Sequence, residues 1–404
     1  MSPRKSSLSG KTAAVVGFNA RPIACSVKKA GANVLVSDYW GDSDLAGCSS
    51  EWTAVLKPTP GLRQREQQEL PVHTRLVKNL VDLVGEKGVD HVFVGSGFDD
   101  RASSLEILDD RWGITGNSPR LMARARDTDR LAKLASELGL HYPDRKSTAS
   151  VSSVLSFCED MGYPCVIRPN ESGGGTGIRL VSGPDEIDRA LRRLKHADRE
   201  IVVQQYVSGI DVSCSVLCTG TEARALSTQG QLIGMPSCGR NCDFVYCGNY
   251  YPTSLNESII KRIESVSEVI CTELGLVGSN GLDYVVDRSN DVWLLEVNPR
   301  IQGTLEMLEI ASRNLVSVLH VNACEGKLPS SRINASPVVK VIVFARKTGT
   351  VPDLSRHPSA VDLTPEGITV KRGDPICTVI EVSDAMRLSY ARAGEVGHLI
   401  QSSI

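Results

Sequence analysis

Three oxygen-bearing side chains, Asp283, Glu296 and Asn298, lie on two short apolar segments separated by a turn. If position 287 pairs with 292, Asp283 lies opposite Glu296, and Glu296 shares a face with Asn298 because strand side chains alternate. Two facing carboxylates repel each other, and a divalent cation between them removes that repulsion. Since Asp, Glu and Asn oxygens suit Mg²⁺, the pattern predicts a metal site. The alternative is an acid pair on the open face of a sheet.

A glycine-rich segment follows an expected strand that ends in Arg168. Its residues are Gly173, Gly174, Gly175, Thr176 and Gly177. Glycine lets backbone N–H groups turn toward a phosphate at no steric cost, and a nearby guanidinium supplies charge. A plain hairpin needs fewer glycines, and no Gly-Lys-Ser/Thr follows as in a Walker loop. We therefore favour phosphate binding, and the acid hairpin and this loop together indicate Mg-nucleotide chemistry.

Arg300 comes directly after the acid hairpin, where Pro299 turns the chain. An arginine at this place could clamp a substrate carboxylate or a transferring phosphoryl group. The alternative is an ordinary surface arginine.

The elements that must position these residues change in type along the chain. Residues 11–100 alternate apolar strands with amphipathic helices, which is typical of a parallel sheet. Gly17 stands alone where a dinucleotide fingerprint needs three glycines, so we do not expect a dinucleotide site. The loop 95–100 follows the carboxyl end of a strand, where open sheets bind ligands. A glycine-rich turn is its more ordinary interpretation.

The later part of the chain is expected to contain helices and then short strands. We predict helices over 124–138, 151–161 and 303–324, a hairpin over 281–298, and a strand-rich end after Pro329. A domain boundary is placed near 330–335.

Composition narrows the classes of function. The 404 residues carry 45 Lys and Arg against 47 Asp and Glu, a net charge of -2, so we expect no nucleic-acid partner. No apolar run approaches the ~20 residues that span a bilayer, and we expect no membrane partner. The first ten residues lack the apolar core of a signal peptide. A cytoplasmic location is therefore expected, with the twelve cysteines as thiols rather than a disulfide framework.

From about 118 to 328 these residues resemble the ATP-grasp superfamily, and the N-terminal lobe resembles its preATP-grasp domain. Arg130 stands where the family usually has a first lysine, and Arg168 takes the place of the second. The segment 202–211 is similar to the family's hinge. There the resemblance implies that Gln204, Gln205, Tyr206 and Val207 cup adenine and that Asp211 reaches the ribose hydroxyls.

The most specific part of the resemblance is the segment 296–300. It implies that Asp283, Glu296 and Asn298 bind two Mg²⁺ ions, which Mn²⁺ could replace, and that Arg300 binds the transferred phosphate or the substrate carboxylate. The layout of the whole chain is similar to the archaeal-type predicted ATP-grasp carboligases. It is more distantly similar to the pyrrolysine-pathway ligase and biotin carboxylase.

The resemblance implies a mixed α/β and α+β fold in three parts. These are a Rossmann-like preATP-grasp domain over 1–117, an ATP-grasp domain over 118–332 and a small β-rich domain over 333–404. It also implies an ADP-forming C–N ligase that uses ATP to activate a small-molecule carboxylate as an acyl-phosphate and couples it to an amine. The dimers frequent in the family favour a homodimer.

Two other functions are kept open. One is an ATP-dependent carboxylase that uses bicarbonate. The other is a nucleotide-binding regulatory protein that lost turnover through the Lys-to-Arg exchanges at Arg130 and Arg168. An acid-to-Gln exchange at Gln204 is a further departure from the family and could tune nucleotide contacts.

Cys238, Cys242 and Cys247 form a cluster without the paired C-x2-C spacing of most zinc sites. We predict a thiol-rich loop near the substrate pocket.

Overall fold

The computed structural model describes residues 6–62, 71–170, 174–175, 177–194, 200–236 and 244–404. Its N-terminal lobe is a four-stranded parallel sheet in the order β3-β2-β1-β4. Leu76, Leu80 and Val84 recur every fourth residue on α3 and are buried in the lobe's core. The elements are β1 (Thr12–Gly17), α1 (Arg21–Lys29), β2 (Asn33–Asp38), α2 (Leu45–Cys48), β3 (Glu51–Ala54), α3 (Val72–Val84), β4 (His91–Val94) and α4 (Glu106–Trp112). The predicted α/β lobe is confirmed.

An antiparallel eight-stranded sheet forms the centre of the molecule, in the order β13-β12-β9-β10-β11-β14-β18-β16. Helix α9 (Glu257–Leu274) packs on β9 and β10. The hydroxyls of Tyr284 and Ser267, on β12 and α9, are 2.7 Å apart, so Tyr284 faces this helix. The strands are β9 (Gly209–Thr219), β10 (Ala223–Ile233), β11 (Tyr246–Tyr251), β12 (Val277–Asp287), β13 (Val292–Asn298), β14 (Val338–Phe344), β16 (Ala360–Val361) and β18 (Pro375–Val382).

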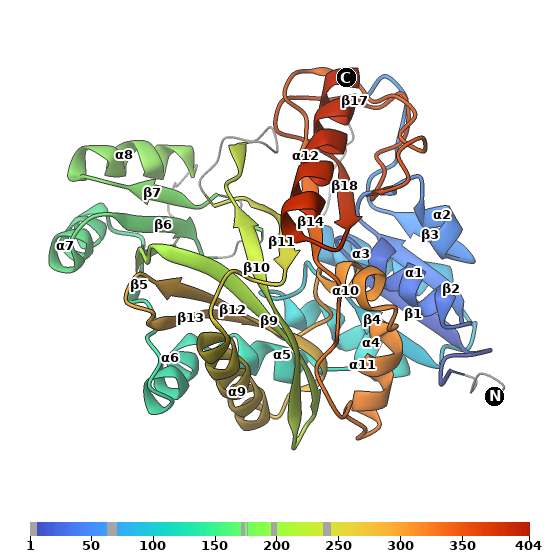
Figure 1. Ribbon diagram of the computed structural model, residues 1–404, viewed down its shortest axis with the longest axis horizontal. Helices are drawn as coiled ribbons and strands as arrows, with labels where there is room; N and C mark the ends of the chain where they lie inside the picture. The colour runs from blue at the N-terminus through green and yellow to red at the C-terminus, as the bar shows by residue number, and fades with distance from the viewer. Residues whose placement is uncertain (1–5, 63–70, 171–173, 176, 195–199, 237–243) are drawn as a thin grey trace.

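A smaller antiparallel sheet with the order β5-β8-β6-β7 lies at one end of the molecule, beside α7 and α8 (Figure 1). The chain passes from its strand β8 directly into β9 of the central sheet, so 206–208 connect the two sheets. Its elements are β5 (Arg145–Thr148), α7 (Val151–Met161), β6 (Cys165–Pro169), β7 (Arg179–Val181), α8 (Pro184–Arg193) and β8 (Ile201–Gln205).

Two of the predicted helices are each divided in two. The helix expected over 124–138 is α5 (Pro119–Ala125) followed by α6 (Thr128–Glu137), because the Asp127 carboxylate accepts hydrogen bonds from the first N–H groups of α6. The helix expected over 303–324 is α10 (Leu305–Ser312) and α11 (Val316–Cys324), separated at Arg313 with φ +58°. Helix α12 (Met386–Ser403) was not predicted.

The central sheet continues across the predicted boundary near 330–335. Strand β14 follows that boundary in the sequence and pairs on one side with β11, which precedes the boundary, and on the other side with β18. Helix α12 packs on both β14 and β18. The short strands β15 (Gly349–Thr350) and β17 (Thr369–Val370) form a separate ladder. The three-domain division stays a prediction, but the last part of the chain shares its sheet with the middle part.

None of the helices in the described ranges combines the length and apolarity needed to cross a bilayer.

The cysteines differ in part from the expectation that all of them are thiols. Cys25 and Cys48 form a disulfide between α1 and α2, so the expectation of thiols is wrong for this pair. The other described cysteines are free thiols: Cys158, Cys165, Cys214, Cys218, Cys247, Cys271, Cys324 and Cys377.

A buried cation joins the N-terminal lobe to the rest of the chain. Arg21 on α1 is 2 % exposed. Its Nη1 donates to Glu306 Oε1 at 2.9 Å, and its Nε donates to Asp362 Oδ1 at 2.6 Å and lies 3.3 Å from Asp44 Oδ2. The neighbouring carboxylates overcome the effect of burial and raise the pKa of Arg21 well above its ordinary value. Removal of Arg21 would leave these acids buried without their cation.

We expect Arg21→Met to lower the free energy of unfolding by about 3–5 kcal/mol, because breaking a buried pair leaves charge uncompensated. Urea unfolding followed by circular dichroism measures this. The matched control is Lys11→Met, which removes the exposed Lys11–Asp90 pair and should cost at most about 1 kcal/mol. Equal losses in the two variants would contradict the role given to Arg21.

Candidate active site

The structure confirms that Asp283 pairs with Glu296 across β12 and β13, but by a different register from the predicted one. Val286, rather than position 287, pairs with Val292, and the register shifts by one residue beyond Tyr284. Leu295 is the extra residue on β13 that restores the pairing of the two acids, as a β-bulge does. The predicted pairing of 287 with 292 was therefore wrong by one residue.

Asp283, Glu296 and Asn298 converge at one point. Asn298 Nδ2 donates to Asp283 Oδ2 at 2.8 Å and lies 3.3 Å from Glu296 Oε1. Gln231 on β10, which the sequence analysis did not identify, donates through Nε2 to Asp283 Oδ1 at 3.0 Å. Because Tyr284 faces α9, the neighbouring Asp283 points to the opposite face of the sheet. The three predicted ligands thus share one site on that face.

The charges at this point favour a bound cation. Burial and the adjacent Glu296 raise the pKa of Asp283 well above its ordinary value. The half-buried setting of Glu296 opposes its ionisation, but the charge of Arg126 outweighs this and lowers the pKa of Glu296 to about 2. Within the described ranges no three His, Cys, Asp or Glu side chains are grouped for a metal. Two carboxylates and an amide nevertheless fit Mg²⁺, which completes its shell with water and phosphate oxygens.

Two arginines contact this triad. Arg300 Nη2 lies 3.3 Å from Asn298 Oδ1, which agrees with the predicted place of Arg300 in the site. Arg126 Nη1 donates to Glu296 Oε2 at 2.9 Å. The sequence analysis missed Arg126 because it placed this residue inside a continuous helix. The Asp127 cap was the available signal, since it begins the new helix α6 and leaves Arg126 between two helices.

Arg130 lies elsewhere. Its Nη2 donates to the Glu273 backbone oxygen at 3.0 Å, at the end of α9. That helix packs on the sheet face opposite the triad, so this geometry gives no support to the nucleotide contact expected of Arg130. Arg126 supplies the cation on the triad's side instead.

Arg168 lies at the end of β6, across from β8. Its Nε is 3.5 Å from Gln204 Oε1, so the predicted cation and the predicted hinge residue are neighbours. Burial lowers the pKa of Arg168 from its ordinary value.

The glycine loop packs against the segment that leads into β11. Gly173 and Thr176 lie outside the described residues. The backbone oxygen of Gly174 accepts a hydrogen bond from Tyr246 N at 3.2 Å. Gly175 has φ +73°, and a Cβ on it would lie 1.6 Å from the Phe244 backbone oxygen. Gly177 also has positive φ, at +87°. The glycines therefore permit a close approach between two backbones.

The predicted hinge residues surround the connection between the two sheets. Gln204 and Gln205 end β8, Tyr206 and Val207 follow, and all four side chains are half-buried. Asp211 lies on β9, where it pairs with Val285 of β12. Burial raises the pKa of Asp211 to about 6.

Of the three clustered cysteines, Cys238 and Cys242 lie outside the described residues. Cys247 is buried in β11, and its Sγ lies 3.3 Å from the Val245 backbone oxygen. The expected thiol-rich loop near the substrate pocket stays a prediction.

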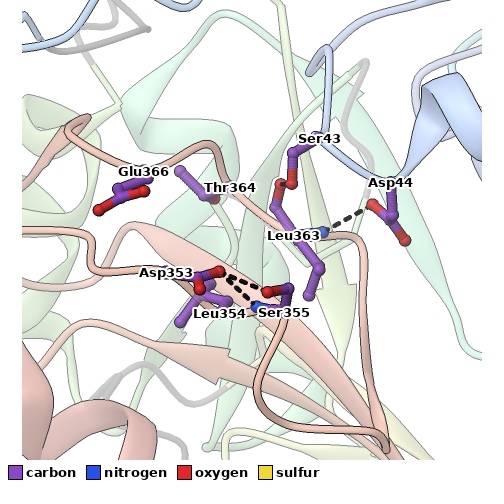
Figure 2. A pocket seen from close by; sticks show the side chains of 8 residues that line it. All are labelled: Ser43, Asp44, Asp353, Leu354, Ser355, Leu363, Thr364 and Glu366. Carbon is purple, nitrogen blue, oxygen red and sulfur yellow. Dashed lines mark hydrogen bonds between the residues drawn. The ribbon is translucent and has the colours of Figure 1, made fainter.

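A cavity of about 390 Å³ lies between the N-terminal lobe and the end of the chain (Figure 2). Asp44 accepts a hydrogen bond there from Leu363 N at 3.0 Å, and Asp353 accepts from Ser355. None of the triad residues lines this cavity. Its lining residues are Ser43, Asp44, Asp353, Leu354, Ser355, Leu363, Thr364 and Glu366.

Comparison with known families matches residues 128–304 to the ATP-grasp domain family. This segment is an ATP-grasp domain. The match begins at the first residue of α6 and ends just before α10, so it includes the triad, the glycine loop and the connection between the sheets.

One relative at the sequence level is an uncharacterized protein of Methanocaldococcus jannaschii. It is 27 % identical over 372 residues, which cover 91 % of this chain and 87 % of the relative.

Two solved structures share the fold over nearly the whole chain. One is the biotin carboxylase domain of Hydrogenobacter thermophilus 2-oxoglutarate carboxylase with MgADP and bicarbonate, with a TM-score of 0.71, 15 % identity and coverage of 95 % of this chain and 88 % of that chain. The other is N5-carboxyaminoimidazole synthase of Aspergillus clavatus with ADP and 5-aminoimidazole ribonucleotide, with a TM-score of 0.71, 14 % identity and coverage of 98 % and 100 %.

We expect Gly175→Ala to lower the free energy of unfolding by about 3–5 kcal/mol, because its methyl group meets the Phe244 backbone in addition to an unfavourable φ. Gly174→Ala is the matched control, since its φ is +59° but a Cβ there meets no atom within 4 Å. It should cost about 1–2 kcal/mol, the penalty of left-handed backbone alone. Urea unfolding of both variants compares them, and an equal cost would contradict the close packing on Phe244.

Proposed function

We propose that this protein is an ADP-forming ligase that joins a small-molecule carboxylate to an amine at the expense of ATP. The observation that carries this proposal is the convergence of Asp283, Glu296 and Asn298 with Arg126 and Arg300 on one face of the ATP-grasp domain. Such a set can hold a metal–phosphate group on one side and an anionic substrate on the other.

The nucleotide would lie between the two sheets. Arg168 and the glycine loop would hold the phosphates, Gln204, Gln205, Tyr206 and Val207 would surround the base, and Asp211 would accept hydrogen bonds from the ribose. In this proposal Arg126 replaces Arg130 as the second cation at the phosphates. Mg²⁺, as two ions or with Mn²⁺ as a substitute, would neutralise charge on the transferring phosphoryl group.

The chain's own residues would act by orientation and charge. Arg300 would hold the substrate carboxylate, one oxygen of which attacks the γ-phosphorus while ADP leaves. The amine nitrogen then attacks the acyl carbon, phosphate leaves, and the amine loses a proton. No protein nucleophile is needed, because positioning and electrostatic stabilisation lower the barrier. A homodimer and a cytoplasmic location belong to the same proposal.

A bicarbonate-using carboxylase is the second candidate. The fold shared with a biotin carboxylase bound to bicarbonate favours it, because bicarbonate could take the place of the organic carboxylate at Arg300.

The test measures ADP release with Mg-ATP across pools of carboxylates and amines, with and without bicarbonate. We expect substrate-stimulated release that falls at least about 100-fold in Glu296→Ala, because the phosphoryl group loses its metal ligand. Glu325→Ala, which removes an exposed partner of Lys327, should retain full activity. Stimulation by bicarbonate without any other carboxylate would favour the carboxylase. ATP binding without stimulated turnover in any pool would favour a regulatory protein.

Asp211 should make nucleotide binding depend on pH. Its pKa is about 6 in the free protein, so it gains a proton as the pH falls through 6 and can no longer accept two ribose hydroxyl bonds. We expect the affinity for ADP to fall between pH 7 and 5 in the wild type more steeply than in Asp211→Asn. Isothermal titration calorimetry measures the affinity for ADP in both proteins. Because the ADP phosphates titrate in the same way in both experiments, the comparison cancels their contribution. Parallel pH profiles would contradict the role of Asp211.

A further inference from the structure

Two neighbouring acids of the N-terminal lobe reach the triad through arginines. Asp99 and Asp100 lie in the loop after β4, at the carboxyl edge of the parallel sheet. We propose that they are positioning residues, which hold Arg300 and Arg126 in the directions that metal binding and phosphoryl transfer require. This inference rests on the proposed function.

The first connection runs from Asp100 through Arg126 to Glu296. Arg126 Nη2 donates to Asp100 Oδ1 at 2.8 Å, and its Nη1 donates to Glu296 Oε2 at 2.9 Å. A guanidinium is planar and presents its N–H groups in a fixed fork, so two acceptors on different nitrogens define its orientation. Asp100 thereby holds Nη2 of Arg126 and leaves Nη1 as the nitrogen that binds the Glu296 carboxylate.

The second connection runs from Asp99 through Arg300 to Asn298. Arg300 Nε donates to both oxygens of Asp99, at 2.9 and 3.0 Å, and its Nη2 lies 3.3 Å from Asn298 Oδ1. The remaining guanidinium nitrogen, Nη1, makes a long contact of 3.4 Å with the Ile301 backbone oxygen. Asp99 thus fixes one edge of the guanidinium and leaves another edge for an anionic substrate.

Both ion pairs are shielded enough to be stronger than surface pairs. The exposed fractions of the four side chains are 19 % and 25 % for Arg126 and Asp100, and 14 % and 17 % for Arg300 and Asp99. Exposed pairs contribute little because water screens them, whereas partly buried pairs keep more of their attraction. The N-terminal lobe therefore contributes to the site although it supplies none of the predicted metal ligands.

The two acids should affect different steps. Without Asp100, Glu296 is the one that remains of these two carboxylate partners of Arg126. Arg126 then competes more strongly with a bound cation for the Glu296 carboxylate. Without Asp99, Arg300 keeps its charge but loses its fixed direction, so an anion beside the nucleotide is bound less well while the metal ligands are untouched.

The experiment uses Asp100→Asn and Asp99→Asn in the full chain. Asp90→Asn, at the other end of β4, is the matched control because it also removes an aspartate from an ion pair of the same lobe. Electron paramagnetic resonance measures the affinity of each protein for Mn²⁺ in the presence of ADP. Calorimetry then measures the affinity of the protein loaded with Mn²⁺ and ADP for inorganic phosphate. Neither readout needs turnover.

We expect Asp100→Asn to weaken Mn²⁺ binding by about 10-fold, and Asp99→Asn to leave it within about twofold while weakening phosphate binding by about 10-fold. Asp99→Glu and Asp100→Glu should restore part of each loss. ADP release, once a substrate pair is known, should fall in both Asn variants.

Two results would overturn the inference. One is wild-type binding of Mn²⁺ and phosphate in both Asn variants. The other is an equal loss of both affinities together with a loss of unfolding free energy and no rescue by Glu, which would mark a purely structural role. A wild-type protein that binds neither ADP nor Mn²⁺ would instead reject the proposed function, and the inference with it.

Discussion

The repulsion between Asp283 and Glu296 is the constraint on which the centre of the molecule depends. Two carboxylates paired across adjacent strands destabilise a sheet unless their charge is balanced. Here Asn298 and Gln231 donate to them, and Arg126 contacts Glu296. Side chains from two strands, β10 and β13, and from one interhelical segment thus hold the two acids together. That arrangement is costly for a fold alone and is expected where a cation and a phosphate bind.

The same charges tie together segments far apart in the sequence. Arg21 on α1 binds Glu306 and Asp362, and the loop after β4 reaches Arg126 and Arg300. Lys340 on β14 is buried and donates to the Gly303 backbone oxygen, three residues after Arg300. Ionic contacts, rather than apolar packing alone, therefore hold the N-terminal lobe and the end of the chain against the ATP-grasp domain.

Local patterns allowed much of the fold to be predicted. The parallel lobe, the acid hairpin and the convergence of the triad follow from strand alternation and from hydrophobic periodicity. The register of the hairpin was wrong by one residue because a bulge at Leu295 leaves no mark in an apolar run. The division at Asp127 was missed because apolar spacing continued through it. This same error hid Arg126, whereas Arg130 was chosen from the family resemblance.

Other features depend on contacts that no local pattern encodes. The pairing of β11 with β14, the disulfide between Cys25 and Cys48, and the ion pairs of Asp99 and Asp100 each join distant segments. The strand-rich end predicted after Pro329 is confirmed in part, since β14 to β18 follow it before the chain ends in α12. It indicated a change in local structure rather than the end of the sheet.

The continuity of the central sheet has a consequence for dissecting the protein. A fragment that stops at the predicted boundary would leave the hydrogen-bonding edge of β11 uncovered, where β14 now pairs with it over four residues from Gly248 to Tyr251. Uncovered sheet edges recruit strands from other molecules. The last part of the chain therefore acts as an edge cover, and truncation there would favour aggregation over a smaller working enzyme.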